Sequence, residues 1–240
     1  MTWSIIARDS ATGQFGIAVA TRFLAAGAHV PHIAAGFGGV ATQALVNPYY
    51  GIDGVRLLCE GHDPGDIVRT LISGDSGRES RQLHIMDATG RIAAHTGRDC
   101  VDWCGHLEGH HFSIAGNMLA GAEVLDQTAM AYAAHTKLPF ARRLIAAMQA
   151  GEAAGGDKRG RQSAALLIHG DEEWSALDLR VDDHADPLAE LARLEQVSRE
   201  RWVHFRQFLP TRANPAGVTD RKTIEAGIEV GIAASNADEI

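Results

Sequence analysis

The residue that most directly predicts chemistry is Thr2, which follows the first methionine. If Met1 is removed, Thr2 carries a hydroxyl nucleophile and a free α-amine that can act as its base. The unperturbed pKa of an α-amine is about 8, so the amine accepts a proton near neutral pH. While Met1 remains, that nitrogen is an amide and cannot act as a base. A simpler interpretation is that threonine follows methionine by chance.

A second candidate is the glycine-rich basic segment 155–163, GGDKRGRQS. Its glycines allow backbone amides to point at an anion. Three side chains add positive charge: Lys158, Arg159 and Arg161. The segment is therefore interpreted either as a binding site for a substrate carboxylate or phosphate, or as a solvated loop with a glycine cap. A further interpretation is that Asp157 and Ser163 support the nucleophile.

Three polar residues come next, and each follows an apolar stretch. Arg22 can steady a nucleophile or bind a carboxylate through its two-pronged guanidinium group. Gln43 and Asn117 can donate hydrogen bonds to an oxyanion. The alternatives are that Arg22 forms a surface ion pair and that the two amides are turn residues.

A cysteine- and histidine-rich segment contains Cys100, Cys104 and His106, whose side chains are of the kind that bind zinc. Their spacing matches no common zinc-finger pattern. We therefore expect two half-buried thiols, no metal and no cofactor.

The composition limits the class of protein. The 240 residues carry a formal net charge of −8, which lacks the basic surface that binding to nucleic acid or to an anionic membrane requires. The three cysteines favour a reducing compartment. The sequence shows no secretory signal and no apolar run of the roughly 18 residues that a membrane span needs. We therefore expect a cytoplasmic protein that binds neither nucleic acid nor a membrane. Its substrate or ligand is expected to be a small molecule.

These residues must be positioned by strands that come in adjacent pairs. The apolar alternation and turn residues predict four such hairpins, at 3–7 and 15–20, 28–35 and 40–44, 82–86 and 91–96, and 163–168 and 174–181. Helical periodicity predicts helix pairs between them, at 50–60 with 63–73 and at 120–135 with 139–150. This order predicts an α+β fold, a four-layer α-β-β-α sandwich of two mostly antiparallel sheets. The segment 97–109 is expected to be irregular.

The C-terminal part is predicted to differ from the rest. A helix is expected to begin at Asp186 and Pro187, with an apolar stripe that runs on to Trp202, Phe205 and Phe208. This aromatic area predicts a homodimer. We expect one domain over residues 1–209 and a peripheral tail over 210–240.

Several long motifs in this sequence resemble those of domain-of-unknown-function family 1028. They are TWSIIARD, GIAVATRF, GVATQALVNPYYGIDGVRLL, GRIAAHTG, GNMLAG and GGDKRGRQSAAL. The resemblance runs from Thr2 to about Arg180. It implies the N-terminal-nucleophile (Ntn) hydrolase fold and places Thr2 where the family motif begins, but it implies no substrate.

The sequence thus predicts an amidohydrolase that acts on a small amide or peptide-like metabolite, with Thr2 as nucleophile supported by Arg22 and Ser163. The main alternative is a non-catalytic binding or assembly protein that retains the fold. A metal-dependent protein centred on Cys100, Cys104 and His106 is a third hypothesis.

Overall fold

The structure is a computed structural model that describes residues 2–238, with side chains described as far as residue 235. Its contacts divide the chain into two compact units, Met1–Leu191 and Ala192–Ile240. The sequence analysis placed the end of a single domain at residue 209, and this boundary stays a prediction.

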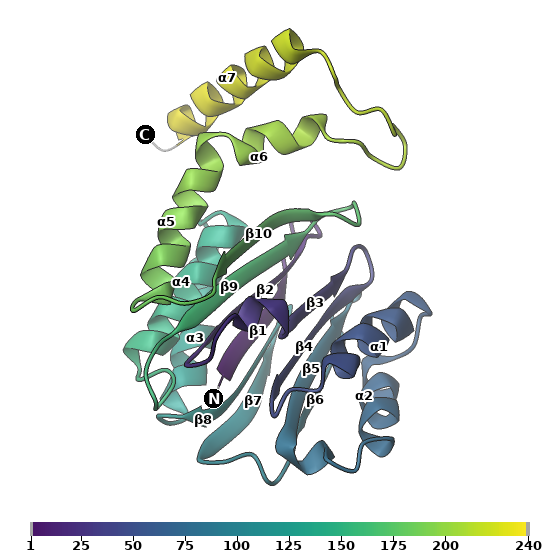
Figure 1. The fold of residues 1–240 in the computed structure, drawn as a ribbon, viewed down its shortest axis with the longest axis vertical. Helices are drawn as coiled ribbons and strands as arrows, with labels where there is room; N and C mark the ends of the chain where they lie inside the picture. Colours follow the sequence, from purple (N-terminus) through teal and green to yellow (C-terminus); the bar gives the residue numbers. More distant parts are fainter. Residues whose placement is uncertain (1, 239–240) are drawn as a thin grey trace. The chain divides into compact units, whose positions relative to one another are not determined.

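The first unit contains two antiparallel sheets (Figure 1). The larger sheet has the strand order β10-β9-β2-β1-β8-β7. Its strands are β1 (Thr2–Arg8), β2 (Phe15–Thr21), β7 (Trp103–Gly109), β8 (Phe112–Leu119), β9 (Ser163–His169) and β10 (Ser175–Val181). The smaller sheet has the order β3-β4-β5-β6. Its strands are β3 (Pro31–Ala34), β4 (Gly38–Ala44), β5 (Arg81–Asp87) and β6 (Ile92–Thr96).

Helices cover the outer face of each sheet. α3 (Glu123–Ala134) and α4 (Phe140–Ala153) pack on the larger sheet, while α1 (Pro48–Cys59) and α2 (Pro64–Ser73) pack on the smaller one (Figure 1). The first pair of helices begins at Asn47 and Asp63, whose side chains accept backbone N–H bonds, and a proline follows each cap. The four layers confirm the predicted α-β-β-α sandwich of two mostly antiparallel sheets.

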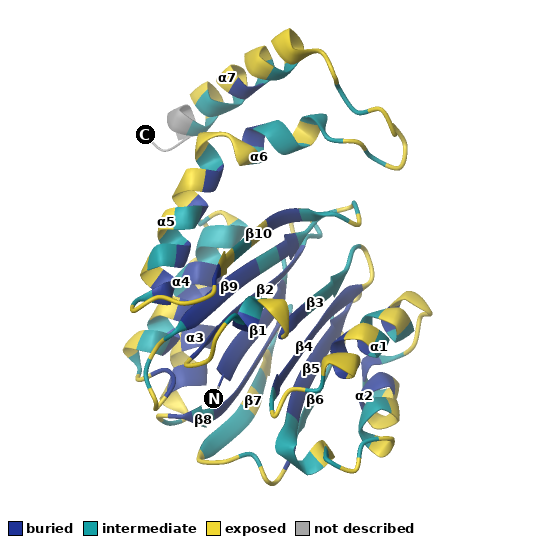
Figure 2. Cartoon of the chain, in the orientation of Figure 1, coloured by how far each residue is buried: buried dark blue, intermediate teal, exposed yellow. Residues whose placement is uncertain are grey.

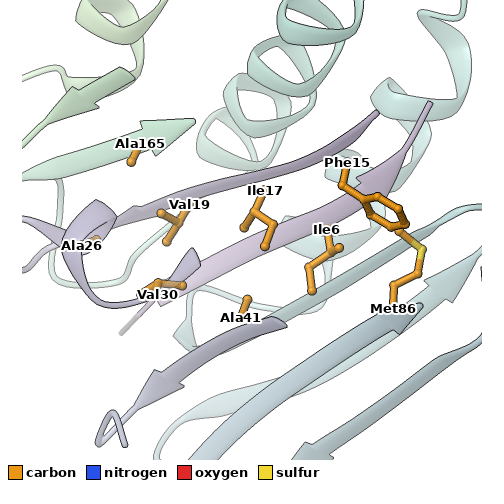
Figure 3. Packing of buried hydrophobic residues seen from close by; sticks show 9 residues of the cluster. All are labelled: Ile6, Phe15, Ile17, Val19, Ala26, Val30, Ala41, Met86 and Ala165. Carbon is orange, nitrogen blue, oxygen red and sulfur yellow. The ribbon is translucent and has the colours of Figure 1, made fainter. Parts of the chain in front are cut away.

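The two sheets pack face to face around an apolar core. Strand β2 is buried along its whole length, as expected for a strand that is covered on both faces (Figure 2). Ile6 and Ile17 from the larger sheet lie near Ala41 and Met86 from the smaller sheet (Figure 3). This contact sets which side chains of β1 face the smaller sheet, because a shift by one residue would exchange the two faces of the strand.

Two segments differ from the sequence prediction. Residues 103–109 were expected to be irregular but form strand β7, which pairs with β8 at the sheet edge. The aromatic and polar residues of this edge strand alternate too weakly to indicate a strand. No helix was predicted in the tail after Pro210, yet it contains the helix α7 (Arg221–Asp238).

The second unit is helical. The predicted C-terminal helix is interrupted: α5 (Pro187–Glu200) ends before the short helix α6 (Trp202–Phe205). Helix α7 packs on α6, and its glycines allow this close approach, because a Cβ at Gly231 would lie 2.6 Å from the His204 ring. Within residues 2–238, no helix has the length and apolar character that crossing a membrane requires.

Candidate active site

Three of the predicted site residues, together with Thr21, lie in one row across the larger sheet. Thr2 at the start of β1 is paired with Thr21 at the end of β2 and with Asn117 near the end of β8. Thr21 is paired in turn with Ser163 at the start of β9. Antiparallel pairing therefore brings polar side chains from four distant segments to one end of the sheet.

A pocket of about 690 Å³ opens at this end of the sheet. Its wall includes Thr2, Thr21, Gln43 and Asn117. This volume lies within the range of small-molecule sites. The pocket brings Thr2 together with both predicted oxyanion residues.

The Thr2 side chain is fixed by a hydrogen bond and still lines the pocket. The residue is 8% exposed, and its hydroxyl donates a hydrogen bond to Thr21 Oγ1 at 3.1 Å. The Thr2 carbonyl oxygen accepts from Gln43 Nε2 and from Asn117 Nδ2, each at 3.4 Å. The two amides thus fix the first peptide of β1 from both sheets.

A buried glutamine anchors these two amides. Gln82 Oε1 accepts from Gln43 Nε2 at 2.8 Å and from Asn117 Nδ2 at 3.0 Å. Its own amide nitrogen donates to the carbonyls of Gly105 and Gly116 and to the Thr96 hydroxyl. Gln82 therefore connects the two sheets directly behind Thr2.

His84 continues this polar network into the core. The Ser4 hydroxyl donates to Gln43 Oε1 at 2.7 Å, so Ser4 can only accept at its 2.9 Å contact with His84 Nε2. His84 Nε2 must then carry the proton, and Nδ1 accepts from the Ser113 hydroxyl at 2.9 Å. Complete burial lowers the pKa of His84 to about 3, so the imidazole is neutral.

Asp157 organises the glycine-rich segment. Its buried carboxylate accepts from the backbone N–H of Arg22 at 2.6 Å and from that of Arg159 at 2.8 Å. It also forms an ion pair with the Arg159 guanidinium at 3.2 Å. Arg159 lines the pocket that contains Thr2. Asp157 therefore places a cation at the pocket wall.

The other predicted residues lie around the pocket rather than in it. Ser163 donates to the Phe23 carbonyl at 2.6 Å and accepts from the Ala26 N–H at 3.1 Å, so it shapes the turn after β2. The guanidinium of Arg22 donates to the Arg159 carbonyl at 3.1 Å and lines a separate hollow of about 620 Å³. Both residues thus act on segments that border the pocket.

The remaining basic residues of the segment are engaged in ion pairs. Lys158 pairs with Asp102 at 3.3 Å. Arg161 pairs with Glu152 at 2.7 Å and with Asp186 at 3.2 Å. Neither Lys158 nor Arg161 is among the residues that line the pocket containing Thr2.

Strained backbone gathers at the pocket. Five non-glycine residues of the described chain have positive φ. Ala44 (φ 69°) and Met118 (φ 53°) line the pocket, while Ala25 and Asp102 each precede or follow a lining residue. Such conformations cost about 1–3 kcal/mol each and concentrate at functional sites. Four of the five strained positions thus lie in or beside the lining of this pocket.

The cysteine segment is built from thiols that hydrogen-bond to the backbone. Cys100 lines the pocket and donates to the Arg81 carbonyl at 3.5 Å, and Cys104 donates to the Cys100 carbonyl at 3.6 Å. Burial raises the pKa of Cys100 to about 11, which keeps the thiol protonated. Among residues 2–238, no group of three histidine, cysteine or acidic side chains is arranged to bind a metal ion.

The sequence analysis did not single out Gln82 or His84 as site residues, and it gave Arg159 only as one of the three basic side chains of segment 155–163. Gln82 and His84 lie at alternate positions of a strand that otherwise reads as apolar, and only the sheet pairing shows that they face β1 and β8. Polar residues inside an apolar strand were the signal that could have identified them.

Comparisons with known proteins agree with this architecture. Residues 2–191 match the model described as "Family of unknown function (DUF1028)". The crystal structure of protein SPO2555 from Silicibacter pomeroyi, assigned to the same family, is 34% identical, with a TM-score of 0.85, and the match covers 92% of this chain and 96% of that one.

A more distant structure is Anbu, the ancestral beta-subunit from Yersinia bercovieri, which is 10% identical with a TM-score of 0.43 over 82% of this chain and 94% of that one. No curated protein matches the chain. The long family match and the SPO2555 structure together show that the chain belongs to the family of unknown function DUF1028.

Proposed function

We propose that the protein is an amidohydrolase whose nucleophile is the hydroxyl of Thr2 after removal of Met1. The observation that carries this proposal is the position of Thr2: it begins a central strand, lines a pocket of about 690 Å³ and has its hydroxyl oriented by Thr21. A hydroxyl on the N-terminal residue needs no separate base, because the α-amine of the same residue can accept its proton.

The reaction requires only the substrate amide and water. The Thr2 oxygen attacks the amide carbonyl carbon, and the Thr2 amine takes the hydroxyl proton. The C–N bond then breaks, the proton passes to the leaving amine, and an ester to Thr2 remains. Water, deprotonated by the same amine, attacks this ester, releases the carboxylic acid and restores the hydroxyl.

The polar network behind Thr2 has a positioning role in this mechanism. Gln43 and Asn117 hold the Thr2 carbonyl, and Gln82 holds both amides. Fixing this peptide fixes the direction of the hydroxyl and of the amine. Oxyanion binding by Gln43 or Asn117 stays a prediction, because each amide would have to exchange a present bond for one to the substrate.

The test compares three proteins whose N-termini are first checked by mass spectrometry for removal of Met1. Wild type is expected to hydrolyse a reactive amide or ester probe, Thr2→Ser to retain part of the activity, and Thr2→Ala to lose it. Thr21→Ala removes the hydroxyl that orients Thr2 and is expected to lower kcat more than it raises KM.

Ser163→Ala is a control for general effects on stability, since it alters the turn that borders the pocket but leaves the Thr2 hydroxyl in place. Equal turnover by wild type and Thr2→Ala, both lacking Met1, would refute the mechanism. Retention of Met1 in protein from its native cell would favour the non-catalytic binding protein.

A further inference from the structure

We propose that the pocket beside Thr2 binds N-acyl amino acids, molecules in which one amide joins an apolar acyl chain to a residue with a free carboxylate. The binding part of this inference stands on the pocket itself, and the hydrolytic part rests on the function proposed above. Two features of the wall carry it: an apolar rim and an anchored guanidinium.

The apolar rim is formed by Phe23, Leu45, Val46 and Val101, which all line the pocket and are between 37% and 66% exposed. They come from three different connections, which follow β2, β4 and β6. Exposed apolar side chains that gather from separate loops mark a binding surface more often than isolated ones do. A ligand that reaches Thr2 through this rim buries the four side chains against its own apolar part.

The anchored guanidinium is that of Arg159. Its side chain is 39% exposed, whereas its ion-pair partner Asp157 is 1% exposed. A ligand in the pocket therefore meets the guanidinium and not the carboxylate that holds it. Because Asp157 also binds the Arg159 backbone N–H, the side chain is preoriented, which favours binding of a carboxylate with defined geometry.

Two further charged groups at the wall, Arg81 and Asp99, fit this assignment. Arg81 lines the pocket but is bound to Asp75 at 3.1 Å and to the Leu45 carbonyl, so it supports the rim. Asp99 is exposed to solvent, where its charge is screened. Thr2 lines the same pocket as the rim and Arg159, as attack on an amide that joins the two parts of the ligand requires.

The direct test measures binding to the Thr2→Ala protein, with removal of Met1 confirmed, so that no turnover occurs. The probes are N-acetylglycine, N-butanoylglycine, N-hexanoylglycine and N-hexanoylglycinamide, titrated by calorimetry. Each added CH₂ group is expected to tighten binding by up to about fourfold if it is fully buried. The glycinamide, which lacks the carboxylate, is expected to bind about tenfold more weakly than the acid.

Two pairs of matched variants separate the two features. Arg159→Gln should abolish the preference for the acid over the glycinamide, whereas Lys158→Gln, which removes the same charge from the neighbouring position, should preserve it. Phe23→Ser should reduce the gain with chain length, whereas Leu24→Ser changes an exposed residue outside the pocket wall and should leave it unchanged. Thermal unfolding of each variant confirms that it is folded.

Equal affinity for the acid and the glycinamide, or no gain from acetyl to hexanoyl, would overturn the assignment. So would failure of N-hexanoylglycine to bind at millimolar concentration. If the probes bind as expected but wild type hydrolyses none of them, the binding assignment stands and the hydrolase proposal fails. If wild type turns over a reactive amide by way of Thr2 but does not bind these acids, the hydrolase proposal stands and the substrate class is wrong.

Discussion

Acid should destabilise this protein through His84. The unfolded chain binds a proton at this residue below pH 6.5, whereas the folded protein does not until about pH 3. The free energy of unfolding therefore falls as the pH decreases from about 6.5 to about 3, and the contribution of neutral His84 is complete above pH 6.5. Between pH 7 and pH 5 the free energy of unfolding falls by about 2 kcal/mol. About 1.5 pH units of this range lie below pH 6.5, and each unit lowers the stability by ~1.4 kcal/mol.

Denaturant unfolding at pH 7 and pH 5 measures this loss. His84→Gln provides the comparison, because an amide has a donor and an acceptor but does not titrate in this range. Wild type should lose about 2 kcal/mol more than His84→Gln, equivalent to a further fall in Tm of about 4–8 °C. His62→Gln, at an exposed site, should behave as wild type. Equal losses in wild type and His84→Gln would refute the assignment of a buried neutral imidazole.

Other predictions follow from the same geometry. Gln82→Ala removes one hydrogen bond from each of two buried amides and two carbonyls, so it should lower the free energy of unfolding by about 2–4 kcal/mol in denaturant titration. An effect below about 0.5 kcal/mol would contradict the role of Gln82. Iodoacetamide at pH 7.5 should label exposed Cys59 well before Cys100, whose pKa is raised to about 11, and peptide mapping that shows the reverse order would contradict this. The homodimer stays a prediction, and a monomeric mass by light scattering at micromolar concentration would reject it.

The sequence predicted the layers because each layer depends on local patterns. Turn residues between apolar runs predicted the hairpins, and helical periodicity predicted the first helix pair. Strand β7 was missed because an edge strand with half-exposed residues has little periodicity. Helix α7 was missed because its contacts, such as that of Gly231 with His204, are with residues distant in sequence.

The site was only partly predictable for a related reason. Thr2, Gln43 and Asn117 lie at the ends of apolar strands. Strand pairing brings Thr2 beside Asn117, and packing of the smaller sheet on the larger one brings Gln43 to them. The choice among the basic residues of 155–163 depended on Asp157, which turns Arg159 to the pocket while Lys158 and Arg161 find other acidic partners. No spacing rule reveals those partners, because they lie in other elements.

The most direct test of the central claim is covalent trapping of Thr2. The protein, with Met1 removal confirmed, is treated with a β-lactone, which acylates active hydroxyl nucleophiles, and then digested with trypsin. The account predicts one adduct per chain on the peptide Thr2–Arg8, at the Thr2 oxygen, and no such adduct in Thr2→Ala. Acylation elsewhere only, or equal acylation of the corresponding peptide in Thr2→Ala, would contradict it.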